Sequence, residues 1–209
     1  MKPVKTNDQI ISYLTLRILI GAVGVLLPFL MIIGKLIANN SWQVENSISD
    51  YYDNGTAGDI LVGELFVLGF FLFTYKGYSR TDDRIADLGG TFALGVALFP
   101  DTTGIQWVSI VHLSCALLLF TVFIIFSLWL FRKTDPKKTP THNKEMRNRV
   151  YLVCGIIMII AVVGLFVSML WLQPYTNDYN LVFWLESVAL ISFGFSWITK
   201  SEYLFWKDR

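Results

Sequence analysis

The sequence predicts an all-α fold, a polytopic membrane protein whose single domain, residues 1–209, crosses the bilayer with six transmembrane helices. The composition is 54% hydrophobic and 15% aromatic, with a mean hydropathy of +0.53, which indicates lipid as the solvent. The apolar residues gather into stretches near the length that a bilayer core of about 30 Å requires. These stretches cover about residues 11–38, 58–77, 85–100, 107–131, 150–172 and 181–199.

The distribution of cations along the chain supports the same topology. When the six stretches are threaded alternately through a bilayer, all of the 17 Lys and Arg residues except Lys35 fall on one side. Cytoplasmic loops of membrane proteins carry the excess of Lys and Arg. We therefore expect both termini in the cytoplasm (N-in/C-in). The expected location is the plasma membrane of a bacterium, or an endomembrane if the source is eukaryotic.

The first three stretches differ in character. The first leads into the longest non-cytoplasmic loop, residues 39–59, which carries four carboxylates and aromatic residues suited to a membrane interface. The second is a nearly continuous apolar run. The third is the shortest and places small residues four positions apart, a spacing that allows close contact between helices. We expect this third helix at the centre of the bundle; its small residues are Gly89, Ala93 and Ala97.

The last three stretches are separated by one basic segment and one short polar segment. Residues 132–149 are rich in Lys and Arg and contain two prolines, so we expect a cytoplasmic loop there, near anionic headgroups. Cys115 and Cys154 lie near opposite ends of the fourth and fifth spans. A disulfide needs its two sulfur atoms at one depth, so we expect free thiols.

Three ionisable residues lie inside spans at a similar depth. Ionisable side chains within a membrane are costly and indicate functional sites by default. Glu64, His112 and Glu186 each lie about five residues from the non-cytoplasmic end of their helix, which corresponds to about 7–8 Å. The loop 39–59 adds Ser47, Ser49 and Asp50 at the rim, and Asp59 and Asp101 lie near helix ends. The sequence thus predicts an outward-facing polar pocket between the second, fourth and sixth helices.

One chemistry open to these residues is acid–base catalysis. His112 could act as the general base, with Glu64 or Glu186 orienting it, and a loop serine, Ser47 or Ser49, as the nucleophile. Such an arrangement is typical of hydrolases and acyl transferases.

Three further interpretations use the same side chains. Asp50, Glu64, His112 and Glu186 could hold a divalent cation that activates water, and a carboxylate-rich set suits calcium, magnesium or manganese at least as well as zinc. The carboxylates could instead line a path for protons or cations. In a purely structural alternative, the polar groups pair and tie the helices together.

Three short motifs at these places carry a resemblance to a known family: Ser47-Ile-Ser-Asp50, His112-Leu-Ser-Cys-Ala116 with Phe120, and Trp184-Leu-Glu186. Together with the six-span, N-in topology, they resemble the DRAM–Frag–Sfk membrane family and its bacterial relatives of unknown function. The resemblance covers nearly the whole chain in architecture and implies, by analogy, lipid-related work in the outer leaflet. Family members include autophagy-linked membrane proteins and a factor that remodels the fatty acids of glycolipid anchors.

Three function hypotheses follow. The first is a protein that binds or acts on a lipid or lipid-linked substrate in the outward pocket, as a membrane-embedded lipid hydrolase or acyltransferase if it is an enzyme. The second is a proton- or cation-coupled transporter or channel, although the span below Glu64 has no polar continuation, which favours a blind pocket. The third is a non-catalytic scaffold. We expect membrane lipids and no nucleic acid as partners; a homo-oligomer is compatible with the sequence.

Overall fold

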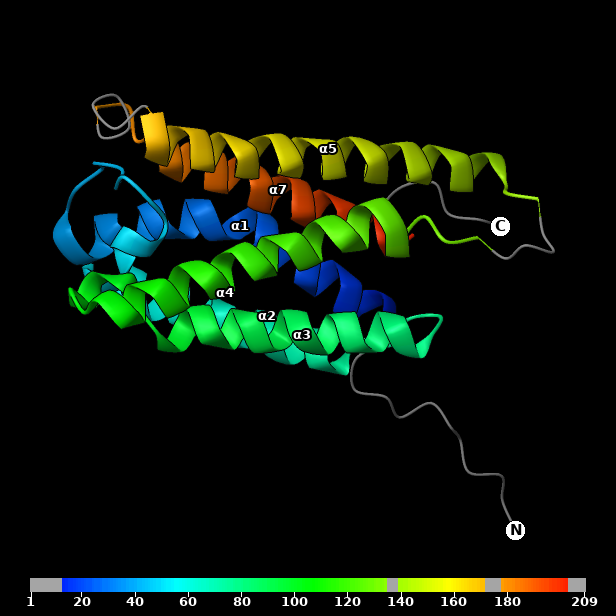
Figure 1. Ribbon diagram of the computed structural model, residues 1–209, viewed down its shortest axis with the longest axis horizontal. Helices are drawn as coiled ribbons and strands as arrows, with labels where there is room; N and C mark the ends of the chain where they lie inside the picture. Colours follow the sequence, from blue (N-terminus) through cyan, green and yellow to red (C-terminus); the bar gives the residue numbers. More distant parts are fainter. Residues whose placement is uncertain (1–12, 135–138, 172–177, 203–209) are drawn as a thin grey trace, which may run out of the picture.

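The computed structural model describes residues 13–134, 139–171 and 178–202, and this part of the chain is helical. Six long helices run side by side along one axis (Figure 1). Two short 3-10 segments, η1 (Ser49–Asp53) and η2 (Asp101–Thr103), and a π-helical end of α4, η3 (Phe126–Leu130), accompany them. The long helices are α1 (Tyr13–Asn39), α2 (Thr56–Thr74), α3 (Arg80–Leu98), α4 (Gln106–Ile125), α5 (His142–Trp171) and α7 (Leu181–Lys200).

Five of the six long helices have the length and apolar composition needed to cross a membrane: α1, α2, α4 with η3, α5 and α7. The exception is α3, which opens with the charged sequence Arg80-Thr-Asp-Asp-Arg84. The described residues therefore have the make-up of an integral membrane protein. Six complete spans, and the side of the membrane on which the termini lie, stay predictions.

The two ends of the bundle have different chemistry. The loop end holds residues 40–55, η2 and the start of α7, and it lies on the left in Figure 1. The basic end holds the start of α1, the α2–α3 connection, residues 131–134, the start of α5 and the end of α7. Among the described residues, every Lys and Arg except Lys35 belongs to the basic end.

Helix α5 corrects one expectation. It begins at His142, so the second half of the expected loop 132–149 is helical. The Thr141 hydroxyl accepts a hydrogen bond from the Lys144 amide (3.1 Å), which satisfies one of the unpaired amides at the start of the helix. Cys115 and Cys154 are free thiols, as expected.

The position of α3 corrects another expectation. This helix packs against α2 and α4 at one edge of the bundle, not at its centre (Figure 1). Its small residues still allow close packing, because a Cβ added at Gly90 would lie 2.8 Å from the Gly69 carbonyl oxygen of α2. Ala93 and Ala97 are buried. The stripe of small residues therefore joins α3 to its two neighbours.

The first and last helices cross at a point where both lack side chains. A Cβ added at Gly21 of α1 would lie 2.6 Å from the carbonyl oxygen of Gly194 in α7 and 2.9 Å from the amide of Ile198. Real Cβ atoms do not come that close to backbone atoms. Gly21 and Gly194 thus let the two backbones touch, which is how helices gain van der Waals contact in lipid.

A cluster of aromatic rings fills the bundle near the basic end. Phe123 of α4 stacks on Phe193 of α7 with 3.6 Å between ring centroids. Trp197 contacts Phe193 and, at 5.0–5.1 Å, Tyr75 and Phe126. All five side chains are at most 2% exposed, so they close the interior of the bundle on this side.

The crossing of α1 and α7 yields the first prediction. Replacing Gly21 by Ala forces two backbones apart, and overpacking of this kind costs about 1–3 kcal/mol. Gly63 is the matched control, because a Cβ added there meets no atom within 4 Å. In thermal unfolding followed by circular dichroism in detergent, we expect Gly21→Ala to melt at a lower temperature than wild type and Gly63→Ala not to. A Gly21→Ala protein as stable as Gly63→Ala would contradict this account of the crossing.

Candidate functional site

The candidate site begins with a reciprocal cap in the first loop. The Ser47 amide donates to Asp50 Oδ2 (3.1 Å), and the Asp50 amide donates to Ser47 Oγ (3.2 Å), so each side chain satisfies the other's backbone. This is the logic of a capping box, applied here at the start of η1. Burial raises the pKa of the Asp50 carboxyl above its ordinary value, although the hydrogen bonds from Ser47 act in the opposite direction.

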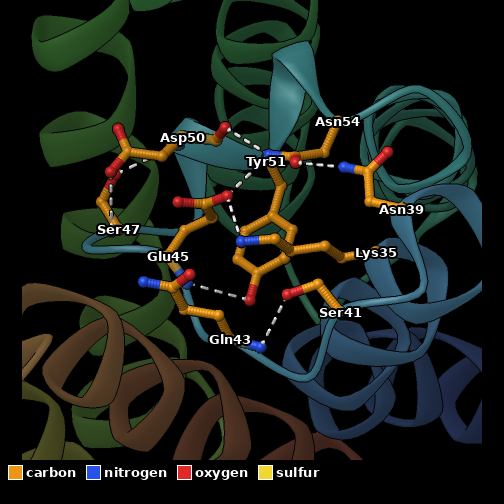
Figure 2. A network of polar contacts seen from close by, with 9 residues as sticks. All are labelled: Lys35, Asn39, Ser41, Gln43, Glu45, Ser47, Asp50, Tyr51 and Asn54. Atoms are coloured by element: carbon orange, nitrogen blue, oxygen red, sulfur yellow. Dashed lines mark hydrogen bonds and ion pairs between the residues drawn. The ribbon is translucent and has the colours of Figure 1, made fainter.

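An ion pair anchors the same loop to the end of α1 (Figure 2). Lys35 is 7% exposed, and its Nζ lies 2.5 Å from Glu45 Oε1. Asn54 Nδ2 donates to the same carboxylate oxygen (3.0 Å), and the Glu45 amide donates to the Tyr51 hydroxyl (3.3 Å). Lys35 is therefore neutralised inside the loop.

A pocket lies beneath this loop, and we name it the His112 pocket. Ile48, Ser49 and Tyr52 of the loop and η1 line it from above, and His112 of α4 and Glu186 of α7 line it from the sides. Its cavity has a volume of about 60 Å³; the whole space between its lining atoms, which includes space open to the surroundings, is about 500 Å³. Apart from these polar residues its lining is apolar and comes from five helices: Leu27, Leu61, Leu65, Val96, Ala116, Leu119, Phe120, Phe123 and Leu190.

The imidazole of His112 is held in one orientation. His112 is 4% exposed, and its Nδ1 lies 2.9 Å from the Phe99 carbonyl oxygen. A carbonyl oxygen only accepts, so Nδ1 carries the hydrogen, and in the neutral ring Nε2 is the basic nitrogen. The Tyr52 ring meets the imidazole edge-on at 5.8 Å, and the Tyr52 hydroxyl donates to the Val96 carbonyl (2.6 Å).

Glu186 connects the pocket to the loop. Its Oε2 accepts a hydrogen bond from the Ile48 amide (2.7 Å), and the Phe183 amide one turn earlier donates to the Asn46 carbonyl (2.8 Å). These two bonds dock residues 46–48 on the start of α7. The pocket therefore owes its covering loop to Glu186.

Ser49 faces Asp101, which the sequence placed near a helix end at the rim of the pocket and not among the predicted catalytic residues. Ser49 Oγ donates to Asp101 Oδ2 (3.1 Å) and lies 3.0 Å from Ser47 Oγ. The other oxygen of this carboxylate, Asp101 Oδ1, is buried without a hydrogen-bond partner in the described structure. Pro100 and Gly104, residues typical of turns, flank η2 and were the available sequence signal for a fixed carboxylate there.

The structure brings together some of the predicted residues and leaves others apart. Ser49, His112 and Glu186 line the His112 pocket, whereas Glu64 and Asp50 do not. In α2 the lining side chains are Leu61 and Leu65, on either side of Glu64. Glu64 is half-buried, and its Oε2 has no hydrogen-bond partner among the described residues. The catalytic roles of all five residues stay predictions.

The arrangement gives no support to a bound divalent cation. Within the described ranges, no group of three or more His, Cys, Asp or Glu side chains is placed to hold a metal ion. The four ligands expected from the sequence do not converge on one point. Asp50 accepts from the Ser47 amide at the start of η1, and Glu186 accepts from the Ile48 amide. His112 Nδ1 faces the Phe99 carbonyl, and Glu64 does not line the pocket.

Loop docking by Glu186 is directly testable. Glu186→Ala removes the acceptor for the Ile48 amide, whereas Glu186→Gln keeps an acceptor oxygen. A hydrogen bond to a charged group is worth about 1.5–3 kcal/mol, so we expect amide exchange at residues 46–50 to accelerate by about 10- to 150-fold in Glu186→Ala. Glu186→Gln should stay closer to wild type. Equal protection in wild type and Glu186→Ala, measured by hydrogen–deuterium exchange, would contradict the docking.

The raised pKa of Asp50 gives a pH dependence. Because its folded-state pKa lies above the unfolded value, the stability associated with Asp50 is fully present below about pH 4 and is lost as the pH rises through the folded pKa. Asp50→Asn keeps an acceptor for the Ser47 amide but cannot ionise. We expect Asp50→Asn to have a higher melting temperature than wild type at pH 8, and we expect this difference in melting temperature to shrink as the pH falls toward 4. The opposite trend in melting temperature would show that the ionised carboxylate is the stabilising form.

Comparison of the chain with protein-family models, with curated proteins and with solved structures finds no match. The function proposed below therefore depends on the geometry of the site and on the physical chemistry of its residues.

Proposed function

We propose that this integral membrane protein binds a lipid or lipid-linked molecule in the His112 pocket. The observation that carries the proposal is the divided lining: Ser49, His112 and Glu186 supply polar groups beside the loop, and the remaining walls are almost wholly apolar. Ligand sites are usually apolar concavities with a few placed polar groups that fix orientation. A lipid has the matching division, with a polar end toward Ser49 and an acyl chain along α2, α4 and α7.

The charge around the pocket narrows the class of headgroup. Asp50, Asp101 and Glu186 lie within electrostatic reach of one another. The only Lys or Arg at this end in the described structure, Lys35, is occupied by Glu45. Carboxylates repel phosphate and accept hydrogen bonds. The ligand is therefore a lipid whose polar end carries hydroxyl or ammonium donors and no net negative charge, such as a monoacylglycerol.

The orientation in the membrane belongs to the same proposal. With the basic end in the cytoplasm, the cations lie where the positive-inside rule expects them, and the loop end lies outside. α3 then serves as the sixth span. The resemblance to the DRAM–Frag–Sfk family is consistent with lipid-related work on that side.

The catalytic form of the proposal is hydrolysis or transfer of an acyl ester. In this form the Ser49 hydroxyl turns from Asp101 toward His112 Nε2, its Oγ attacks the ester carbonyl, and its proton passes to Nε2 and then to the leaving alcohol. Water or a second alcohol then attacks the acyl-serine and gives up its proton by the same route. The fixed Nδ1–H of His112 supports this assignment, because it leaves Nε2 as the base.

A cation- or proton-coupled transporter is the second candidate, and Glu64 is the observation that favours it. In a membrane helix, a buried carboxylate oxygen without a partner in the described part of the chain is a candidate proton or cation site. The packed rings of Phe123, Phe193 and Trp197 stand between the pocket and the basic end, which argues for a blind pocket. Liposome flux that depends on Glu64 would favour transport over lipid binding.

Ligand binding tests the main proposal. A pyrene-labelled monoacylglycerol added to the purified protein reports binding by energy transfer from the native tryptophans. Losing one hydrogen bond costs about 0.5–1.5 kcal/mol, so we expect about 2- to 13-fold weaker binding in His112→Asn and in Ser49→Ala. His112→Asn retains a donor for the Phe99 carbonyl and so separates binding from folding.

Ile110→Ala is the matched control, because Ile110 lies on α4, is 56% exposed and does not line the pocket. Wild-type protein that does not bind the probe, or binding equally strong in the pocket variants and in Ile110→Ala, would refute the proposal. Ester turnover that is the same in wild type and His112→Asn would refute the catalytic form alone.

A further inference from the structure

A second hollow lies beside the His112 pocket, between α4 and α5, and we name it the α4–α5 crevice. Leu117 of α4 and Val162, Leu165 and Phe166 of α5 line it, with Glu186 of α7 at its inner side. Its cavity has a volume of about 230 Å³; the whole space between its lining atoms, which includes space open to the surroundings, is about 720 Å³. The described lining is apolar except for Glu186 and Ser114.

The paths of the two helices explain why a crevice exists there. Figure 1 shows α4 close to α5 near the basic end and separating from it toward the loop end. The contact near the basic end is made by η3, where Leu128 meets Gly155 of α5. The crevice lies on the other side of this contact, in the same half of the bundle as His112.

The crevice and the His112 pocket share a wall. Ala116, Phe120 and Glu186 line both. Ala116, whose side chain is only a methyl group, borders both hollows. A chain lying in the crevice would therefore reach the pocket at Glu186, beside its polar end.

The surroundings of the crevice determine what can occupy it. α4 and α5 both have the make-up of membrane-spanning helices, and the crevice side chains Leu113, Phe166 and Met169 are 42–49% exposed. In a bilayer such side chains face hydrocarbon, where lipid tails, not water-soluble molecules, are present. The occupant is an acyl chain of the leaflet in which the loop end lies.

We infer that the α4–α5 crevice is a lateral opening through which a membrane lipid passes its acyl chain from the bilayer into the His112 pocket. This inference rests on the proposed function and adds the route and the physical source of the ligand: a bilayer-resident lipid, taken up sideways between two helices. It also implies that Val162 and Leu117 affect the rate at which the lipid enters and leaves the pocket, and not the strength of its binding.

The test separates the rate of binding from its strength. Val162→Phe narrows the crevice without touching the lining of the pocket, and Ile160→Phe, at a neighbouring site that is 64% exposed and outside the crevice, is the matched control. Stopped-flow energy transfer to a long-chain pyrene-labelled monoacylglycerol in liposomes gives both rates. We expect association and dissociation to slow together by about tenfold in Val162→Phe, with the equilibrium affinity unchanged.

A water-soluble short-chain monoacylglycerol, followed by its competition with the probe in detergent, should bind equally strongly to both variants. If Val162→Phe folds poorly, Leu117→Phe narrows the opposite wall at a position already 39% exposed. Rates in the narrowed variant that equal those of Ile160→Phe, or equal slowing in both, would overturn the lateral opening while leaving the proposed function intact. Wild-type protein that binds neither lipid would overturn the proposed function itself.

Discussion

The hydrogen bond from the Ile48 amide to Glu186 is the interaction on which the candidate site depends. It joins residues that are 138 positions apart in the chain, and it acts together with the backbone bond between Phe183 and Asn46. The ring of Tyr51 also packs on Phe183, with 5.9 Å between centroids. Without these contacts the first loop has no fixed relation to α7. Ser49 and Tyr52 are also held near His112 by their bonds to Asp101 and to the Val96 carbonyl.

The acidic residues of the loop end divide into two groups with different physical roles. Glu45 and Asp50 hold the loop in shape, the first by pairing with Lys35 and the second by capping η1. Asp101 and Glu186 instead receive hydrogen bonds from the loop, at Ser49 and Ile48. The loop is thus stabilised by its own acidic residues, and it places Ser49 in the lining of the pocket. All four residues carry a carboxylate, so their different roles come from the groups that lie next to each of them.

Hydropathy predicts depth in a membrane well and rotation about a helix axis poorly. Five apolar stretches become helices suited to spanning a bilayer, and the helix ends lie near the expected positions except where a cap extends α5. Glu64 shows the limit of such reasoning. Its expected depth follows from counting residues, but Leu61 and Leu65, not Glu64, line the His112 pocket. Nothing in an almost uniformly apolar helix marks which side faces inward.

The same limit explains why the position of α3 and the contact between Asp101 and Ser49 were not predicted. The small residues of α3 predict close packing, and α3 does pack closely. They do not determine how many helices surround it, and for this reason its position at the edge of the bundle was not predicted. Asp101 lies in a short turn whose position relative to Ser49 depends on the packing of α3 and α4. Contacts between distant segments were accessible only from the folded chain.

The contact between Gly21 and Gly194 has a consequence for biosynthesis. Because α1 and α7 meet backbone to backbone, the bundle cannot close until the ribosome has released α7. Until then the bare glycine face of α1 is covered by lipid or by the insertion machinery. A chain truncated before α7 would therefore leave the membrane with an open bundle for quality control to remove.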